Sequence, residues 1–230
     1  DYYAKYNINQ AYICYENAEF YCDSELDLEI IQEHKRIAQE AETFNVKKFA
    51  IIILSYNQVE MTKQCIESIR KNNTESSYEI VIVDNNSTDG AREWLKAQKD
   101  IKVICNDENK GFPAGCNQGI KAAEPDYDIF LLNNDTIVTP NALFWLRMGL
   151  YERKDVGATG SISNHAGNDQ RVDGQYATVE EYIQFGIHNN VPMRNPYEKK
   201  VWLVGFALML KREAIDAVGL LDVRFSPGIY

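Results

Sequence analysis

Four short apolar runs, separated by segments of helical length, constrain the fold of this chain most strongly. They are Ala50 to Leu54, Ile80 to Val83, Ile101 to Cys105 and Ile129 to Leu132. Continuous apolar runs of this length are typical of strands buried on both faces of a sheet. Strands that alternate with helices over short links predict a parallel sheet built from right-handed crossovers. We therefore expect an α/β fold with a mostly parallel sheet flanked by helices.

Polar residues follow each apolar run directly. The most informative are Ser55-Tyr56-Asn57 after the first run, Asp84-Asn85 after the second and Asn133-Asn134-Asp135 after the fourth. An Asx-rich triplet taken alone favours a turn. Several such ends meeting at one edge of a sheet instead predict a ligand-binding crevice, and the oxygens around Asp135 suit a hard divalent cation.

A glycine-rich stretch, residues 109–119, lies between the third and fourth runs. Gly111 and Gly115 would allow a ligand to approach the backbone closely, and a helix that starts near Pro113 would offer free N–H groups. Neither the phosphate-loop pattern nor the dinucleotide-binding pattern of glycines is present. A plain loop that leads into a packed helix is the alternative interpretation.

The overall charge argues against a nucleic-acid partner. The 230 residues carry a net charge of -10, whereas binding to phosphate backbones depends on clustered lysine and arginine. The sequence has no run of 18 apolar residues and no signal-peptide pattern, so we expect a soluble, cytoplasmic protein, peripheral at most to the inner face of the membrane. Its five cysteines show neither zinc spacing nor a disulfide framework, which predicts reduced thiols.

Residues 1–46 differ in character from the rest, because they lack glycine and proline and show helical spacing of aromatic and alanine residues. Ser24 resembles a helix N-cap, and an apolar face then follows in Leu28, Ile31, Ile37 and Ala38. The pair of helices resembles half of a tetratricopeptide-type repeat. Either this appendage docks a protein partner or a second copy, or it packs on the main domain.

The second half of the chain is less regular. We expect a helix from Thr139-Pro140 to Leu150, a mobile loop at residues 161–175, a capping box at Thr178 and Glu181, and surface positions for His165 and His188. A strand is expected from Val201 to Leu210, and Ser87 or Thr88 is expected to cap the helix that carries Trp94.

Five blocks together resemble a family 2 glycosyltransferase of the GT-A fold. They are Ile-Ile-Leu-Ser-Tyr-Asn (52–57), Ile-Val-Asp-Asn-Asn-Ser-Thr-Asp-Gly (82–90), Asn-Lys-Gly-Phe-Pro-Ala-Gly-Cys-Asn-Gln-Gly (109–119), Leu-Leu-Asn-Asn-Asp-Thr (131–136) and Gly-Phe-Ala-Leu-Met-Leu-Lys-Arg-Glu-Ala (205–214). The resemblance implies that residues 47–230 form a Rossmann-like GT-A domain. It also implies inverting transfer of a sugar from a nucleotide diphosphate donor to a glycan, lipid-linked or protein acceptor.

The resemblance further implies the site residues. Asp135 would bind Mg or Mn, although Asn133-Asn134-Asp135 has one carboxylate where the family has Asp-x-Asp. Trp202, Gly205 and Phe206 would lie on the acceptor side. The donor nucleotide would contact Ser55, Tyr56, Asn57, Asp84, Asn85, Gly111, Phe112, Asn117, Asn133 and Asn134.

The resemblance places the general base just beyond Tyr230. We therefore expect residues 1–230 to form a nearly inactive fragment that is incomplete at its C-terminus. Two alternatives stay open. One is a non-catalytic module that binds nucleotide sugars or an assembly partner. The other, a sugar nucleotidyltransferase, would need a glycine-rich loop with Arg or Lys where Ser55-Tyr56-Asn57-Gln58 stands.

Overall fold

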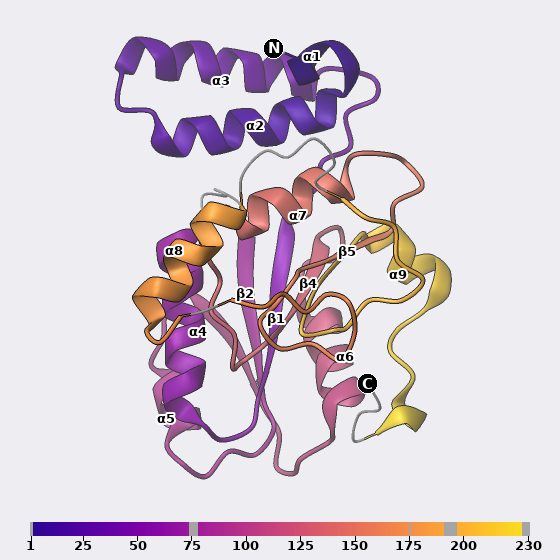
Figure 1. The fold of residues 1–230 in the computed structure, drawn as a ribbon. Helices are drawn as coiled ribbons and strands as arrows, with labels where there is room; N and C mark the ends of the chain where they lie inside the picture. Colours follow the sequence, from indigo (N-terminus) through magenta and orange to yellow (C-terminus); the bar gives the residue numbers. More distant parts are fainter. Residues whose placement is uncertain (1, 74–77, 175, 191–196, 227–230) are drawn as a thin grey trace.

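The chain forms a six-stranded sheet with helices on both faces (Figure 1). The computed structural model describes residues 2–73, 78–174, 176–190 and 197–226. The predicted α/β class is confirmed. The strands are β1 Phe49–Ser55, β2 Tyr78–Asp84, β3 Ile101–Cys105, β4 Asp128–Asn133, β5 Ala158–Gly160 and β6 Ala207–Leu210.

Helices precede the sheet, connect its strands and follow it. The Ser24 hydroxyl accepts from Asp27 N at the start of α3, and both halves of the Thr178–Glu181 capping box are present on α8, as predicted. Helix α5 is instead preceded by Gly90 at φ 91°, a conformation that glycine adopts without strain. The helices are α1 Tyr2–Tyr6, α2 Ile8–Tyr21, α3 Glu25–Gln39, α4 Val59–Asn72, α5 Ala91–Lys96, α6 Phe112–Ala122, α7 Ala142–Leu150, α8 Val179–Asn189 and α9 Arg212–Val218, with a 3-10 turn η1 at Val223–Phe225.

The sheet order is β3-β2-β1-β4-β6-β5, and the first four strands of this order run parallel. Strand β6 is antiparallel to both β4 and β5. The register pairs Ser55 with Asp84, Asp84 with Cys105, and Leu54 with Asn133. The carboxyl ends of all four predicted strands therefore meet at one edge of the sheet, as expected.

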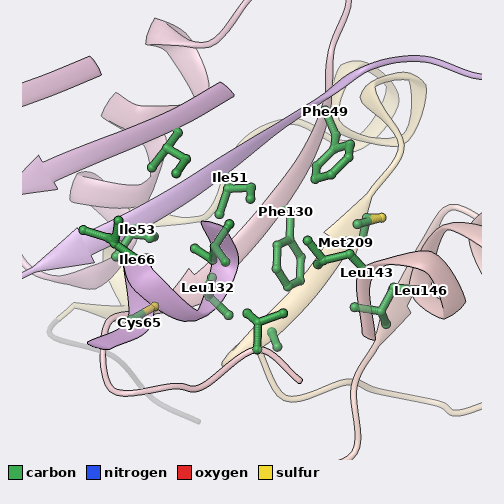
Figure 2. Close-up of a cluster of buried hydrophobic side chains, with 14 of the residues drawn as sticks. Phe49, Ile51, Ile53, Cys65, Ile66, Phe130, Leu132, Leu143, Leu146 and Met209 are labelled. Atoms are coloured by element: carbon green, nitrogen blue, oxygen red, sulfur yellow. The ribbon is translucent and has the colours of Figure 1, made fainter. Parts of the chain in front are cut away.

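The core has two layers, one on each face of the sheet. On one face, Phe49, Ile51 and Phe130 pack with residues of α4 and α7 (Figure 2). Leu95 of α5 belongs to the same layer. On the other, Ile52 and Leu131 pack against α6 and α9. Residues alternate between the two layers along each strand, which explains why each strand reads as a continuous apolar run.

Three local predictions are wrong. Neither Ser87 nor Thr88 caps helix α5, because Gly90 directly precedes it. The strand expected from Val201 pairs only over Ala207–Leu210, so Trp202 and Gly205 precede β6 rather than lying in it. Helix α7 begins at Ala142, because the Asn190 side chain holds Thr139 Oγ1 and the Pro140 carbonyl in the preceding loop.

The N-terminal helices pack on the main domain through α2 and α7. The fully buried Ile13 joins the core layer of α7. Gln10 Nε2 donates to Met148 O at 2.8 Å, and Arg147 Nη1 donates to Glu16 Oε2 at 2.8 Å with both side chains almost inaccessible. In Figure 1, α2 lies between α3 and α7. Helix α2 therefore packs on the main domain, whereas α3 keeps an outer face.

The structure corrects one residue of the apolar face expected on α3. Ile37 is 50% exposed, whereas Ala38, which the sequence placed on the same face, is fully buried.

All five cysteines are free thiols. Among the described residues, no helix combines the length and the apolar character needed to cross a membrane.

Candidate functional site

The carboxyl end of β1 turns sharply into α4. Asn57 has a left-handed backbone at φ 58°, and the turn is held by Asn57 N, which donates to Ser87 Oγ at 2.8 Å. Asn57 Oδ1 also accepts from Thr88 N at 2.9 Å. Ser55 is fully buried, with its hydroxyl 3.2 Å from Thr62 Oγ1. Tyr56, by contrast, is 50% exposed, so its ring is available to a ligand.

Asp84 is fully buried at the end of β2. Its Oδ2 accepts from Arg92 Nε at 2.7 Å, and its Oδ1 accepts from Ser87 N at 3.2 Å. The hydrogen bond to the Asp84 carboxylate raises the pKa of Arg92 above its usual value. Arg92 Nη2 also donates to the backbone oxygen of Asn106. Asp84 thus fixes the loops after β2 and β3 through Arg92, and its carboxylate does not reach the surface.

A chain of side-chain amides connects the end of β2 to the glycine-rich loop. Asn106 Nδ2 donates to Asn85 Oδ1 at 2.9 Å and to Gln118 Oε1 at 2.8 Å. Asn85 Nδ2 in turn donates to Asn109 Oδ1 at 2.9 Å, and Asn109 Oδ1 also accepts from Gly111 N at 2.9 Å. We call these four side chains (Asn85, Asn106, Asn109 and Gln118) the amide network. It holds the loop before α6 in one position against the sheet edge.

The glycines of α6 have different roles. Gly111 precedes the helix at φ 78°, where a side chain would be strained. A Cβ at Gly115 would overlap the Leu54 side chain, so this glycine brings α6 close to β1 instead of admitting a ligand. Asn117 is also engaged: its Nδ2 donates to Leu221 O at 2.7 Å and its Oδ1 accepts from Leu221 N at 3.0 Å. The Asn117 amide clamps the segment before η1 to α6.

The turn after β4 contacts both the start of α4 and the segment before β6. Asn134 Nδ2 donates to Thr62 Oγ1 at 3.0 Å, which links this turn to the first turn of α4, where Thr62 also contacts Ser55 at the end of β1. The Asn133 backbone N–H donates to Phe206 O at 2.8 Å, which links it to the segment before β6. Asp135 is exposed. Its carboxylate is therefore accessible at the end of the central strand pair.

A cavity of about 840 Å³ opens beside this turn, between the sheet and α7, α8 and the loop after β5. Five of the predicted site residues line it, whereas the predicted residues at the ends of β1 and β2, together with Gly111, Asn117, Asn134 and Trp202, do not. The lining residues from the prediction are Phe112, Asn133, Asp135, Gly205 and Phe206. The site is thus divided into a polar sheet edge and a largely apolar cavity, with Asp135 next to both.

The donor set around Asp135 suits a cation that is shared with a ligand. The described residues contain no group of three or more His, Cys, Asp or Glu side chains placed to hold a metal ion. In proteins, Mg²⁺ is usually coordinated by one or two carboxylates, by phosphate oxygens of the substrate and by several water molecules. One carboxylate with amide oxygens nearby is consistent with such a coordination sphere. The residues present therefore fit a metal that is bound chiefly by a diphosphate.

Sequence reasoning did not identify several residues of this site. Asn106 directly follows β3, as Asn133 ends β4, so the same polar strand-end signal could have found it. Arg92 and Gln118 lie on helices and gave no such signal. His165 is exposed, as predicted, but it lines the cavity, and Tyr182 of α8 does so too.

The expected position of the general base, after Tyr230, lies outside the described residues. Asp222, the carboxylate nearest to that end among them, bonds Arg224 through both of its oxygens. Hydrogen bonds from Arg224 lower the pKa of the Asp222 carboxyl. A carboxylate held in this way is a weak proton acceptor, so Asp222 is not assigned this role.

The family model described as "Glycosyl transferase family 2" matches residues 50–219, which contain the sheet edge, the amide network and the turn at Asp135. The chain belongs to glycosyl transferase family 2. The chain therefore shares its family with glycosyl transferases.

Two relatives illustrate the family. The glycosyltransferase GlyG of Streptococcus pneumoniae is 28% identical over 187 residues, which are 78% of this chain and 60% of that protein. The poly(ribitol-phosphate) beta-glucosyltransferase of Bacillus spizizenii is 29% identical over 115 residues, which are 47% of this chain and 18% of that protein. The chain therefore spans less than two thirds of these relatives.

A solved structure of a sugar transferase has a similar fold. The mannosyltransferase PcManGT of Pyrobaculum calidifontis, in complex with GDP-Man and Mn²⁺, superposes with a TM-score of 0.55 at 16% identity, over 93% of this chain and 59% of that one. The match and the sheet topology identify the fold as GT-A, as the sequence predicts.

Proposed function

We propose that this chain transfers a sugar from a nucleoside diphosphate-sugar donor to a hydroxyl group of a glycan, lipid-linked or protein acceptor, with inversion at the anomeric carbon. The observation that carries the proposal is the position of Asp135, which is exposed, lies two residues after the end of the central strand β4 and lines the cavity. A ligand at the sheet edge with its reacting end toward the cavity would pass this carboxylate.

The polar sheet edge would take the nucleoside. Tyr56 offers an exposed ring, and the amide network fixes the backbone before α6 beside it. Asp84 and Asn85 would act on the nucleoside through the loops they hold, because both are almost inaccessible. The presence of GDP-Man in a neighbour of the same fold supports a donor of this class.

Asp135 would hold a divalent cation, Mg or Mn, together with the diphosphate. When bound, such a cation neutralises the charge that develops on the departing diphosphate. Asp135 is the sole carboxylate of its triplet, so the donor would bring most of the ligands to the metal. The Mn²⁺ in the neighbouring structure supports this assignment.

The cavity would receive the acceptor. Phe112, Gly205 and Phe206 line the cavity, and Trp202 is 54% exposed on the segment before Gly205. The acceptor oxygen would attack the anomeric carbon on the face opposite the diphosphate, so that the new C–O bond forms as the bond to the diphosphate breaks. The similarity to a poly(ribitol-phosphate) glucosyltransferase supports a cell-surface polymer as the product.

A thermal-shift experiment on the chain tests the donor part of the proposal. Nucleoside diphosphates, their sugars and the matching monophosphates are compared with and without Mn²⁺, because a ligand that binds only the folded state raises the melting temperature. We expect diphosphates to stabilise the chain more with Mn²⁺ than without it, and monophosphates to show no such synergy. If no nucleotide raises the melting temperature, the proposed donor class is wrong.

Turnover tests the catalytic part separately. A donor identified in this way is incubated with the chain and with cell-surface polymer fragments, and products are followed by mass spectrometry. Formation of a glycosylated product supports transfer. Binding of the donor without any transfer to a broad acceptor set would favour the alternative of a non-catalytic nucleotide-sugar-binding module.

A further inference from the structure

One face of helix α4 holds the segment that follows β4. Four of its polar side chains reach this segment, at the spacing of successive helical turns: Thr62, Cys65, Ser68 and Asn72. Residues three or four positions apart lie on the same side of a helix. The segment they hold, residues 133–138, contains Asp135. Its path is therefore set by α4 as well as by the sheet.

The contacts hold the segment on both sides of Asp135. Before it, Asn134 Nδ2 donates to Thr62 Oγ1 at 3.0 Å. After it, the Val138 backbone N–H donates to Ser68 Oγ at 2.9 Å. Asp135 thus lies between two points that are fixed to the same helix, and the first of these points is its direct neighbour in the chain.

The Thr62 hydroxyl joins β1 and β4 just beyond their last backbone pair. That pair is Leu54 with Asn133. The hydroxyl connects the next residue on each side, because it lies 3.2 Å from Ser55 Oγ and accepts from the Asn134 amide. A threonine hydroxyl can accept one hydrogen bond and donate another, so both contacts can be made at once.

We propose that Thr62 is a positioning residue for the divalent cation, because its hydroxyl, through Asn134, fixes where the Asp135 carboxylate lies at the sheet edge. This inference rests on the proposed function, in which Asp135 holds the metal. Thr62 itself is fully inaccessible, so it acts without touching the cation or the donor. Groups that orient a metal ligand in this way raise the affinity for the metal, since the ligand is ordered before the metal binds.

Ser68 should have a different effect, although it lies on the same face of α4. It holds Val138, which lines the cavity and lies three residues beyond Asp135. Without the Ser68 hydroxyl the cavity wall should loosen, while the turn at Asp135 stays attached to Thr62. Ser68→Ala is therefore the matched control, since it also removes one buried hydroxyl from this face.

Mn²⁺ is the probe that tests the proposal, alone and with inorganic diphosphate. Bound Mn²⁺ is paramagnetic and broadens the amide NMR signals of nearby residues, so a titration gives both its place and its affinity. We expect broadening around Asp135 in wild type. Thr62→Val, which removes the hydroxyl at nearly constant shape, should weaken Mn²⁺ binding about two- to tenfold, the range that corresponds to one lost hydrogen bond. Thr62→Ser and Ser68→Ala should bind like wild type.

A double-mutant cycle tests whether Thr62 acts through Asn134. Asn134→Ala should weaken Mn²⁺ binding as much as Thr62→Val, and the double variant should be no weaker than either, because all three lack the same hydrogen bond. Asn134 is only partly buried, so this variant breaks the contact without changing the buried face of α4. Thermal unfolding is measured in parallel. Thr62→Val and Ser68→Ala should lose similar stability, so that only the metal affinity separates them.

Three results would overturn the proposal: Mn²⁺ affinity unchanged in Thr62→Val, affinity weakened equally in Ser68→Ala, or additive losses in the double variant. Each of these leaves the proposed function intact. Absence of broadening around Asp135 in wild type, with either probe, would overturn this inference together with the metal assignment. If Mn²⁺ behaves as expected but no nucleotide raises the melting temperature, the donor class is wrong and the role of Thr62 stands.

Discussion

Asn106 Nδ2 donates to Asn85 Oδ1 across 2.9 Å, and both residues are almost completely buried at the ends of adjacent strands. This contact joins β2 and β3 beyond the last backbone pair of the sheet. Because Asn85 also holds Asn109, the position of the loop before α6 depends on a residue, Asn106, that no ligand is expected to touch. The relationship gives the site a rigid edge that does not depend on the donor being bound.

Asn106→Ala should lower the free energy of unfolding by about 1–3 kcal/mol, because it leaves buried amide groups of Asn85 and Gln118 without a partner. It should also weaken nucleotide binding, since the loop at Gly111 loses its support. Urea denaturation and calorimetry measure the two effects. Gln64→Ala, which changes an exposed amide on α4, serves as the control, and equal behaviour of both variants would contradict the proposed role of the amide network.

Arg147→Met should lower the free energy of unfolding by about 3–5 kcal/mol, because it leaves the buried Glu16 carboxylate without its cation. The double variant Glu16→Leu with Arg147→Met should recover much of this loss, since no unpaired charge remains. Chemical denaturation of the four forms gives the coupling. The exposed pair Arg153–Asp155 is the control, and Arg153→Met should change stability little. A double variant less stable than Arg147→Met alone would contradict this account.

Asp128 should make stability depend on pH. Burial raises the pKa of this carboxyl above 3.8, although Tyr151 O–H at 2.5 Å and Arg212 N at 2.9 Å both donate to it. A carboxyl whose pKa is higher in the folded state than in the unfolded state binds its proton more tightly when folded. Its stabilising contribution is therefore complete below pH of about 4 and is lost as the pH rises through the folded-state pKa.

The comparison with Asp128→Asn, which cannot ionise, isolates this effect. The unfolding free energy of wild type minus that of Asp128→Asn should fall as the pH rises from about 4 and then level off. Asp126→Asn, at an exposed position nearby, is the control. A difference that instead grows with pH would mean that the hydrogen bonds from Tyr151 and Arg212 outweigh burial.

The sequence predicted the strands well because apolar runs between polar residues leave little choice of where a buried strand ends. Ile101 to Cys105 is observed with the predicted bounds. The long apolar stretch before Leu210 misled the prediction, because Phe206 bonds β4 only through its carbonyl and pairing in the β6 ladder begins at Ala207. Apolar character alone does not distinguish a paired strand from a chain that lines a cavity.

From the sequence, a site residue could be predicted only where it lies at the end of a strand or belongs to a family motif. Asp84 was found by its place at the end of a strand, but its partner Arg92 depends on how α5 sits over that end. The two hydrogen bonds of Asn117 with Leu221 likewise join residues 104 positions apart, a contact that no local pattern reveals. Side-chain pairing across loops is set by the packed fold, so these roles appear only in the structure.

The most direct test of this account is the effect of Asp135→Ala on metal-dependent nucleotide binding. Calorimetry measures the affinity of the chain for its preferred nucleoside diphosphate with and without Mn²⁺, for wild type, Asp135→Ala and the exposed control Asp126→Ala. We expect Mn²⁺ to tighten binding in wild type and in Asp126→Ala, and to have little effect in Asp135→Ala, whose melting temperature should be nearly unchanged. If Mn²⁺ tightens binding equally in Asp135→Ala, then Asp135 does not hold the metal and the central assignment is wrong.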